Sequence, residues 1–414
     1  MNFLEFAVWG AYLTSQGRYL AGVGLAHHIG WFFSVQGIVS IFMPALIGIL
    51  ADKWLPAQKM LGLCHAVAGI AMLATGWYGL TAGDNVQFSV LFSLYTVSIA
   101  FFMPTIALSY SVAYTLLEKA GYDTVKDFPP IRVFGTVGFI CSMWAVDLLG
   151  FQGSAMQYVI SGGLGLVLAC YAFSMPDCRV DKPVEEKPSL IESMGLKAFT
   201  LFKDSRMAVF FIFAFLLGAA LQISNGFANT FIGDFGGIDI YADTFGVKHS
   251  NMLISLSQVS ETLCILMIPF FLRKWGIKKV MLTAMIAWCL RFGFFAVGNP
   301  GSGVWLFVLS MIVYGVAFDF FNISGSLFVD KSTDSSIRSS AQGPFMLMTN
   351  GLGAAIGSLA AQAVVTKYTA GLEGAAKMAG WSHAWYIFAA YALVIAIFFA
   401  LLFKYKHTPE GDKA

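Results

Sequence analysis

The sequence predicts an all-α polytopic membrane protein with twelve transmembrane helices. Of the 414 residues, 58% are hydrophobic and 12% are charged, whereas a soluble domain carries about 25% charged residues. The hydrophobic residues come in runs of roughly twenty, which is long enough to cross a hydrocarbon core roughly 30 Å thick. Transmembrane strands would be short and would alternate polar with apolar residues, so the spans are predicted to be helices.

The predicted spans follow one another through short polar or glycine-containing connections. The first starts directly after Met1 and Asn2, without the basic segment and small-residue cleavage motif of a signal peptide, so we expect it to be retained. Pro44, Pro104 and Pro269 lie inside apolar runs, where membrane helices tolerate proline as a kink. The spans are 3–20, 29–51, 60–80, 88–116, 131–149, 156–175, 207–231, 252–272, 280–297, 304–328, 343–365 and 385–403.

Basic residues divide unequally between the two sides of the membrane. If the N-terminus lies inside, most of the 25 Lys and Arg residues fall on the inner side. Basic side chains mark the cytoplasmic side, so both termini are predicted to be cytoplasmic, as an even number of helices requires. The exceptions are Arg18, Lys248, Arg291, Lys367 and Lys377.

One sizeable polar segment separates the sixth and seventh spans. Pro176, Pro183 and Pro188 interrupt its first half, and Ser189 with Glu192 forms a capping-box pattern at the start of its second half. We interpret the segment as a flexible linker followed by an amphipathic helix on the inner membrane surface; a wholly disordered linker is the alternative. The predicted organisation is an N-terminal six-helix bundle at 1–175, a cytoplasmic linker at 176–205, a C-terminal six-helix bundle at 206–404 and a cytoplasmic tail at 405–414.

The two halves share a short repeat. Lys53-Trp54 follows the second span, and Lys274-Trp275 follows the eighth. Two six-helix halves related by an axis along the membrane normal are the arrangement of the major facilitator superfamily, which is the predicted fold. The loop at Asp52 and Lys53 also resembles that superfamily's signature between helices two and three, where an acid and basic residues hold the cytoplasmic gate. Ordinary positive-inside chemistry is the alternative for this loop taken alone.

Four spans carry polar side chains at membrane depth, each set on one helical face. Such side chains are costly in lipid and normally face the bundle interior or a water-filled cavity, and residues three, four or seven positions apart share a face. An interhelical hydrogen bond is the alternative role for a lone Asn or Gln. The stripes are Arg132, Thr136 and Phe139 in the fifth span; Gln222, Asn225 and Asn229 in the seventh; Gln258 and Glu261 in the eighth; and Phe318, Asp319, Asn322 and Ser326 in the tenth.

Two carboxyl groups in these stripes are candidates for proton coupling. Glu261 lies near the middle of its span, and Asp319 lies in the inner half of the tenth. Desolvation at this depth disfavours the charged form of a carboxyl group, so either group can exchange a proton, and Arg132 is the predicted charge partner. Amide side chains suit a ligand with many donors and acceptors but no fixed charge. Phe139 or Phe318 could stack on a planar ring of such a ligand.

Other function classes fit the sequence less well. A net charge of +2 offers no field that would attract nucleic acid. The six Cys have no CxxC spacing and the six His are dispersed, so we expect no metal, no cofactor and no enzyme active site. A sensor would need a soluble output domain, and an efflux antiporter would favour a larger, more apolar cavity. Proton-coupled import of a sugar or a free nucleobase in the same fold is the nearest alternative.

Several runs of the sequence resemble motifs of the bacterial nucleoside:proton symporter family of the major facilitator superfamily. The similarity extends over nearly the whole chain without large gaps, and several of the motifs are specific to that family. The runs are FMPALIG at 42–48, DKW at 52–54, FPPIR at 128–132, LQISN at 221–225, SQVSET at 257–262, AFDFFNISG at 317–325, SAQG at 340–343 and TNG at 349–351.

The resemblance implies a proton-driven importer of purine or pyrimidine nucleosides in the bacterial cytoplasmic (inner) membrane. It implies alternating access in a monomer, with Asp319 as the leading proton-coupling residue and Glu261 and Arg132 as its partners. Ala220 departs from the family, because some members carry an acid there, and the outer loop at 233–250 is dissimilar. The implied substrate-binding set is Arg132, Thr136, Phe139, Gln222, Asn225, Gln258, Glu261, Phe318, Asp319 and Asn322.

Overall fold

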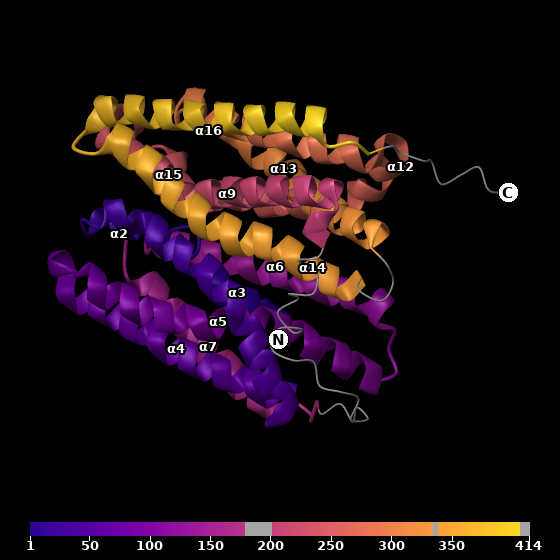
Figure 1. Ribbon diagram of the computed structural model, residues 1–414. Helices are drawn as coiled ribbons and strands as arrows, with labels where there is room; N and C mark the ends of the chain where they lie inside the picture. Colours follow the sequence, from indigo (N-terminus) through magenta and orange to yellow (C-terminus); the bar gives the residue numbers. More distant parts are fainter. Residues whose placement is uncertain (179–200, 334–337, 406–414) are drawn as a thin grey trace. The chain divides into compact units, whose positions relative to one another are not determined.

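The structure, a computed structural model, is built from helices (Figure 1) and describes residues 1–178, 201–333 and 338–405, with the backbone alone at 49, 52, 53, 125 and 338–341. Most of the predicted linker helix and all but the first residue of the predicted tail lie outside the described residues. The chain divides into two compact units, Met1–Met194 (unit 1) and Gly195–Ala414 (unit 2).

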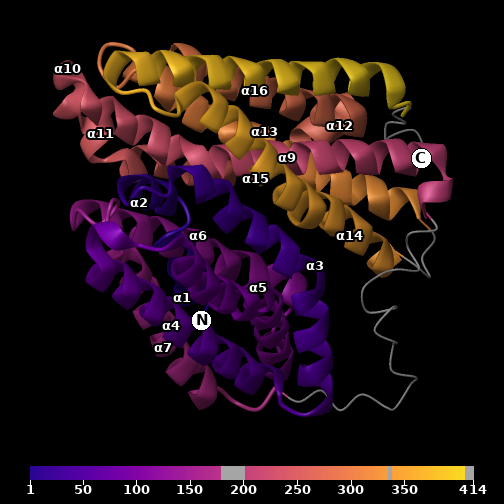
Figure 2. The ribbon, with the colours of Figure 1, turned by 60° about the vertical axis from the view of Figure 1, so that its left-hand side comes forward.

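Unit 1 is a bundle in which α4 packs against both α5 and α7, α1 packs against α6 and α7, and α3 packs against α5. Figures 1 and 2 both show α4 and α7 running side by side. Its helices are α1 (Asn2–Gly10), α2 (Gln16–Gly22), η1 (Ala26–His28), α3 (Ile29–Lys53), α4 (Ala57–Ala82), η2 (Gly83–Asn85), α5 (Phe88–Lys119), α6 (Thr124–Leu148) and α7 (Met156–Ser174).

The first predicted span is divided between α1 and α2. Helical backbone hydrogen bonds still run through the gap, from the Leu13 amide to the Trp9 carbonyl and from the Gln16 amide to the Tyr12 carbonyl. Ser15 in the gap donates a hydrogen bond to the Gln157 side chain of α7 at 2.9 Å. The segment is therefore one span with a distorted middle turn, tied to α7 by a polar side chain.

Unit 2 is a second helical bundle. α12 packs against α13 and α16, and α9 packs against α15 and η5. Its helices are α9 (Ser205–Asp234), η4 (Phe235–Gly237), α10 (Asp239–Ala242), α11 (Phe245–Lys248), α12 (Ser250–Val297), α13 (Val304–Ser332), α14 (Arg338–Met346), η5 (Leu347–Gly353), α15 (Ala354–Thr369) and α16 (Gly374–Leu402).

The twelve predicted spans correspond to the helices of the structure. Within the described ranges, ten helices are long and apolar enough to cross a bilayer. α12 contains the eighth and ninth predicted spans, which are separated at Gly276, where φ is 74°. This left-handed conformation favours glycine, so the basic turn after Trp275 ends one span and starts the next. The divided first span completes the set.

Two spans begin at least seven residues earlier than predicted. α16 starts at Gly374 rather than at Trp385, because the run before Trp385 is only weakly apolar, while its Ala, Lys and Met residues favour a helix. α6 starts at Thr124 and includes Pro129 and Pro130 inside the helix; membrane helices tolerate internal proline, because neighbouring groups satisfy the freed backbone atoms.

Candidate functional site

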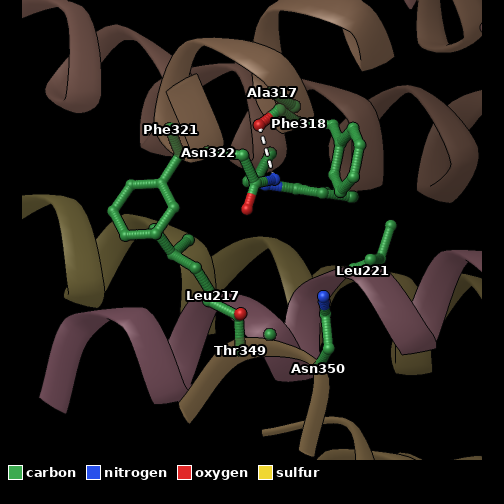
Figure 3. Close-up of a pocket in the computed structure, with 10 residues that line it drawn as sticks. Leu217, Leu221, Ala317, Phe318, Phe321, Asn322, Thr349 and Asn350 are labelled. Atoms are coloured by element: carbon green, nitrogen blue, oxygen red, sulfur yellow. Dashed lines mark hydrogen bonds between the residues drawn. The ribbon is translucent and has the colours of Figure 1, made fainter. Parts of the chain in front are cut away.

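A pocket in unit 2 lies between α9, α12, α13 and the π-helical segment η5 (Figure 3). Its empty volume is about 270 Å³, open side included. Phe318 and Asn322 are the two predicted site residues that line it. The complete lining is Leu217, Gly218, Leu221, Trp288, Ala317, Phe318, Phe321, Asn322, Thr349 and Asn350.

The pocket offers aromatic faces and amide groups together. The Phe318 ring lies parallel to the Tyr314 ring, with centroids 5.8 Å apart and planes at 10°. The Asn322 Nδ2 atom donates a hydrogen bond to the Phe318 carbonyl at 2.9 Å, and the Asn350 side chain points into the pocket from the opposite side (Figure 3). Phe318 is therefore oriented by Tyr314, while Asn322 and Asn350 place polar atoms at the pocket.

The π-helix η5 places Thr349 and Asn350 at the pocket, and it crosses α9 at very short range. A Cβ atom added at Gly218 would lie 2.2 Å from the Thr349 carbonyl oxygen, closer than any van der Waals contact allows. Wide π turns are rare and occur often at functional sites. Sequence analysis did not predict Asn350, because its position depends on this local backbone geometry.

We expect Gly218→Ala to separate α9 from η5 and to destabilise unit 2. Overpacking of a well-packed contact costs about 1–3 kcal/mol, so the thermal unfolding midpoint in detergent should fall. Gly293→Ala is the matched control, because a Cβ atom at Gly293 meets nothing within 4 Å and Ala favours a helix over Gly by about 1 kcal/mol. An equal midpoint for the two variants would contradict the proposed close contact.

The two predicted carboxyl groups lie close to one another in unit 2. Asp319 is only 4% exposed, and the Tyr314 hydroxyl interacts electrostatically with both Asp319 and Glu261. The Cys264 thiol interacts with the same two carboxyl groups. Gly315 fixes this arrangement, because a Cβ atom there would lie 2.6 Å from the backbone of Ser260. α12 and α13 therefore bring Glu261 and Asp319 to the same region of the bundle.

Arg291 is a buried cation of unit 2 that sequence analysis grouped with residues on the outer side. It is 2% exposed, and its Nε and Nη2 atoms donate to the Ser224 hydroxyl at 3.0 and 2.7 Å. Its Nη1 atom donates to the Ser310 carbonyl at 2.6 Å and to the Ser257 hydroxyl at 3.4 Å. Its guanidinium also lies 4.7 Å from the centre of the Tyr314 ring.

These contacts connect Arg291 to every helix of unit 2 that carries predicted site residues. Ser224 lies between Gln222 and Asn225 on α9, and Ser257 precedes Gln258 on α12. Tyr314 interacts electrostatically with Arg291 as well as with the two carboxyl groups. Tyr314 is therefore a shared neighbour of Arg291 and of the two carboxyl groups. A charged residue in the middle of an apolar span normally marks a functional position, and this signal was available in the sequence.

The amide stripes separate into two groups. Asn229 donates through Nδ2 to the Asn251 Oδ1 atom at 2.7 Å and accepts from the Ser250 hydroxyl at 3.2 Å, so it has the interhelical role that was the alternative for a lone amide. Gln222, Asn225 and Gln258 are partly buried but do not line the pocket.

In unit 1, Arg132 and Thr136 lie together. The Arg132 Nε atom donates to the Tyr110 hydroxyl at 2.7 Å, its Nη1 atom lies 3.5 Å from the Thr136 hydroxyl, and its guanidinium lies 4.2 Å above the Phe6 ring. Phe139 is buried and contacts Trp9 edge-on, with centroids 6.4 Å apart.

Two predictions are not decided by these contacts. Arg132 belongs to unit 1, whereas Glu261 and Asp319 belong to unit 2, so its pairing with a carboxyl group stays a prediction. Asp52 and Lys53 lie at the end of α3, but their side chains are outside the described ones, so the gate role also stays a prediction.

The chain is similar to known proteins both in sequence and in structure. A family model described as Nucleoside H⁺ symporter matches residues 1–408. The xanthosine permease of Escherichia coli K12 is 48% identical over 422 residues, covering 100% of this chain and 96% of the permease. The nucleoside permease NupG of the same organism is 45% identical over 419 residues, covering 100% and 97%. A crystal structure of a NupG mutant superimposes with a TM-score of 0.91 at 44% identity, covering 97% of this chain and 98% of that one.

Proposed function

Because the chain belongs to the nucleoside H⁺ symporter family, it is a multi-pass membrane transporter that imports nucleosides with protons, and we propose that Phe318, Asn322 and Asp319 are central to its substrate and proton site. The observation that carries this proposal is the Tyr314–Phe318 stack beside a deeply buried carboxyl group. A nucleobase is planar and can stack on Phe318, while its edges and the ribose hydroxyls need the donors and acceptors that amides provide.

The remaining predicted residues complete the proposed site. Gln222, Asn225 and Gln258 hydrogen-bond ribose hydroxyls and base edges, and Arg132, Thr136 and Phe139 provide the surface from unit 1. In symporters of this architecture the binding site lies near the bilayer midplane, and the two bundles rock around it to expose it to either side. Residues from both units are then needed at one site.

Proton coupling is proposed to reside in Asp319, with Glu261 and Arg132 as its partners. Asp319 is protonated from the outer side, the neutral carrier binds nucleoside and reorients, and the proton leaves to the cytoplasm after the nucleoside. Arg291 shares the neighbour Tyr314 with both carboxyl groups, and its proposed role is to favour release of the proton once the nucleoside has left.

The placement in the membrane is proposed from the distribution of basic residues. Both termini face the cytoplasm of a bacterial inner membrane, Asp52 and Lys53 form the cytoplasmic gate, and the transporter acts as a monomer in the lipid bilayer. The two bundles are 1–175 and 206–404, joined by a linker at 176–205 that carries an amphipathic helix. Protease accessibility of tagged termini in inside-out vesicles tests the orientation.

The function is tested by uptake in a transport-deficient bacterial strain that expresses this chain. We expect accumulation of labelled uridine or adenosine that collapses when a protonophore is added, and little uptake of uracil or ribose. Accumulation of uracil or ribose in preference to both nucleosides would contradict the proposed substrate class. Resistance of nucleoside accumulation to the protonophore would contradict proton coupling.

We expect Gln222→Ala, Asn225→Ala and Gln258→Ala each to weaken nucleoside binding. Loss of one partner of a buried polar contact costs about 1–3 kcal/mol, which corresponds to roughly tenfold to a hundredfold in affinity. Calorimetry in detergent measures the affinity, and Thr283→Ala is the control, because its hydroxyl only bonds the Lys279 carbonyl of its own helix. Wild-type affinity in all three folded variants would exclude the amides from the site.

A further inference from the structure

Glu5 and His65 form a second buried ionisable cluster, in unit 1, that sequence analysis did not identify. Both side chains are 0% exposed, and the His65 Nε2 atom lies 2.7 Å from the Glu5 Oε2 atom. α1 carries Glu5, α4 carries His65, and Thr105 of α5 completes the cluster with its hydroxyl 2.6 Å from Glu5 Oε1. Ionisable groups at membrane depth are costly, and they commonly mark proton or ion pathways.

The hydroxyl of Thr105 allows Glu5 to be either charged or neutral. This hydroxyl has one hydrogen and two acceptors at 2.6 Å, namely Glu5 Oε1 and the Phe102 carbonyl. When Glu5 is a carboxylate, Thr105 donates to it. When Glu5 is protonated, its hydroxyl donates to Thr105, which then donates to Phe102. The hydrogen bonds of Glu5 and Thr105 are satisfied in both states, so a proton can bind to Glu5 without breaking its contact with Thr105.

His65 also lines a cavity of unit 1 with an empty volume of about 220 Å³. Tyr12, Ser98 and Ser161 contribute hydroxyl groups to the same wall. The Nδ1 atom of His65 is buried and has no hydrogen-bond partner within the described part of the chain. The cavity, whose lining also includes apolar residues, has room for about one water molecule, and a proton on Nδ1 would give the imidazolium a donor toward it. The cluster therefore has two places for a proton, Glu5 and His65 Nδ1.

The cluster is connected to Arg132 through two neighbouring residues, Phe6 and Tyr110. Phe6 follows Glu5 in the chain, and the Arg132 guanidinium lies 4.2 Å above its ring. The hydroxyl of Tyr110, which accepts from Arg132 at 2.7 Å, interacts electrostatically with both Glu5 and Arg132. The other ionisable groups recorded around Glu5 in the described residues are the Cys64 thiol of α4 and the amino group of Met1.

We propose that Glu5 and His65 form a second proton-binding site of the transporter, whose protonation is linked to nucleoside binding through Arg132; this inference rests on the proposed place of Arg132 in the substrate site. With His65 neutral and Glu5 ionised, the cluster has a charge of −1 and holds Arg132 by attraction. Uptake of one proton neutralises the cluster, and the guanidinium is then released to donate hydrogen bonds to acceptor atoms of the ligand. Proton binding in unit 1 thus favours nucleoside binding.

The test is the number of protons taken up when uridine or adenosine binds, measured by calorimetry in buffers of different ionisation enthalpy between about pH 5 and pH 8. Glu5→Gln keeps the shape of the side chain, and its amide can still accept from His65 and donate to Thr105, but it cannot take a proton. We expect the proton uptake of Glu5→Gln on nucleoside binding to be lower than that of the wild type by up to about one proton. One linked proton changes the nucleoside affinity by up to about tenfold per pH unit, and this pH dependence should be lost in the variant. His65→Gln, a second variant, should show the same direction.

Thr75→Val is the matched control. Thr75 is buried on α4, the helix of His65, and its hydroxyl only bonds the Ala71 carbonyl, so proton uptake should equal that of the wild type. Wild-type proton uptake in folded Glu5→Gln or in folded His65→Gln would overturn the proposal and make the cluster a structural ion pair. Absence of nucleoside binding by the wild-type protein would instead refute the function proposed above, so the two failures are distinguishable.

Discussion

Asp319→Asn is expected to bind nucleoside but to fail in accumulating it against a gradient. Asn keeps the shape and hydrogen bonding of a neutral carboxyl group at a side chain that is only 4% exposed. In the proposed cycle the neutral form accepts nucleoside from outside, so binding should survive. The variant cannot release a proton to the cytoplasm, so the empty carrier does not reset. A pH difference of one unit drives about tenfold accumulation by a one-proton symporter, and this factor should be lost.

The measurement is proton-driven accumulation beside counterflow in the same proteoliposomes. Counterflow exchanges labelled for unlabelled nucleoside without return of the empty carrier, so we expect it to persist in Asp319→Asn. Asp330→Asn is the matched control, because it removes a carboxyl group from the same helix, α13, near its end. Wild-type accumulation by Asp319→Asn would remove Asp319 from the proton path and leave Glu261 as the carboxyl group to test.

The spans and the stripes were predictable because both depend on short stretches of sequence. Hydropathy over about twenty residues identifies a membrane helix, and the four-residue spacing of Arg132 and Thr136 is sufficient to place them side by side. The division of the first span near Ser15 was not predictable, since it accompanies a hydrogen bond to Gln157, far away in the sequence. The π-helix that turns Asn350 into the pocket likewise depends on the contact between Gly218 and Thr349.

Three ionisable residues were not predicted from the sequence, and the reason is the same for each. Glu5, His65 and Arg291 each stand alone within a predicted span, without a polar neighbour at helical spacing that would have formed a stripe. Their partners lie on other helices: Glu5 meets Thr105, and Arg291 meets Ser224. Ionisable character at membrane depth was the available signal; the identity of the partner required the packing of the bundle.

Arg291→Met is expected to lower the stability of the transporter strongly. Met has a similar length but no donor, so the Ser224 hydroxyl and the Ser310 carbonyl lose their buried partner. Leaving a buried polar group without its partner costs about 1–3 kcal/mol for each group. The thermal unfolding midpoint in detergent should therefore fall, whereas Arg273→Met at an exposed helix position should change the stability by less than about 0.5 kcal/mol.

Arg291→Lys separates positioning of the site from folding. Lysine restores the positive charge, so the variant should regain most of the thermal stability lost in Arg291→Met. A single ammonium group cannot reproduce the planar guanidinium, which reaches Ser224 and Ser310 while lying over Tyr314. Tyr314 then no longer holds Phe318 in its stacked position, and nucleoside affinity should fall roughly tenfold, with a smaller rise in the unfolding midpoint on adding nucleoside. Wild-type nucleoside affinity in folded Arg291→Lys would show that Arg291 contributes charge and stability but does not orient the aromatic stack.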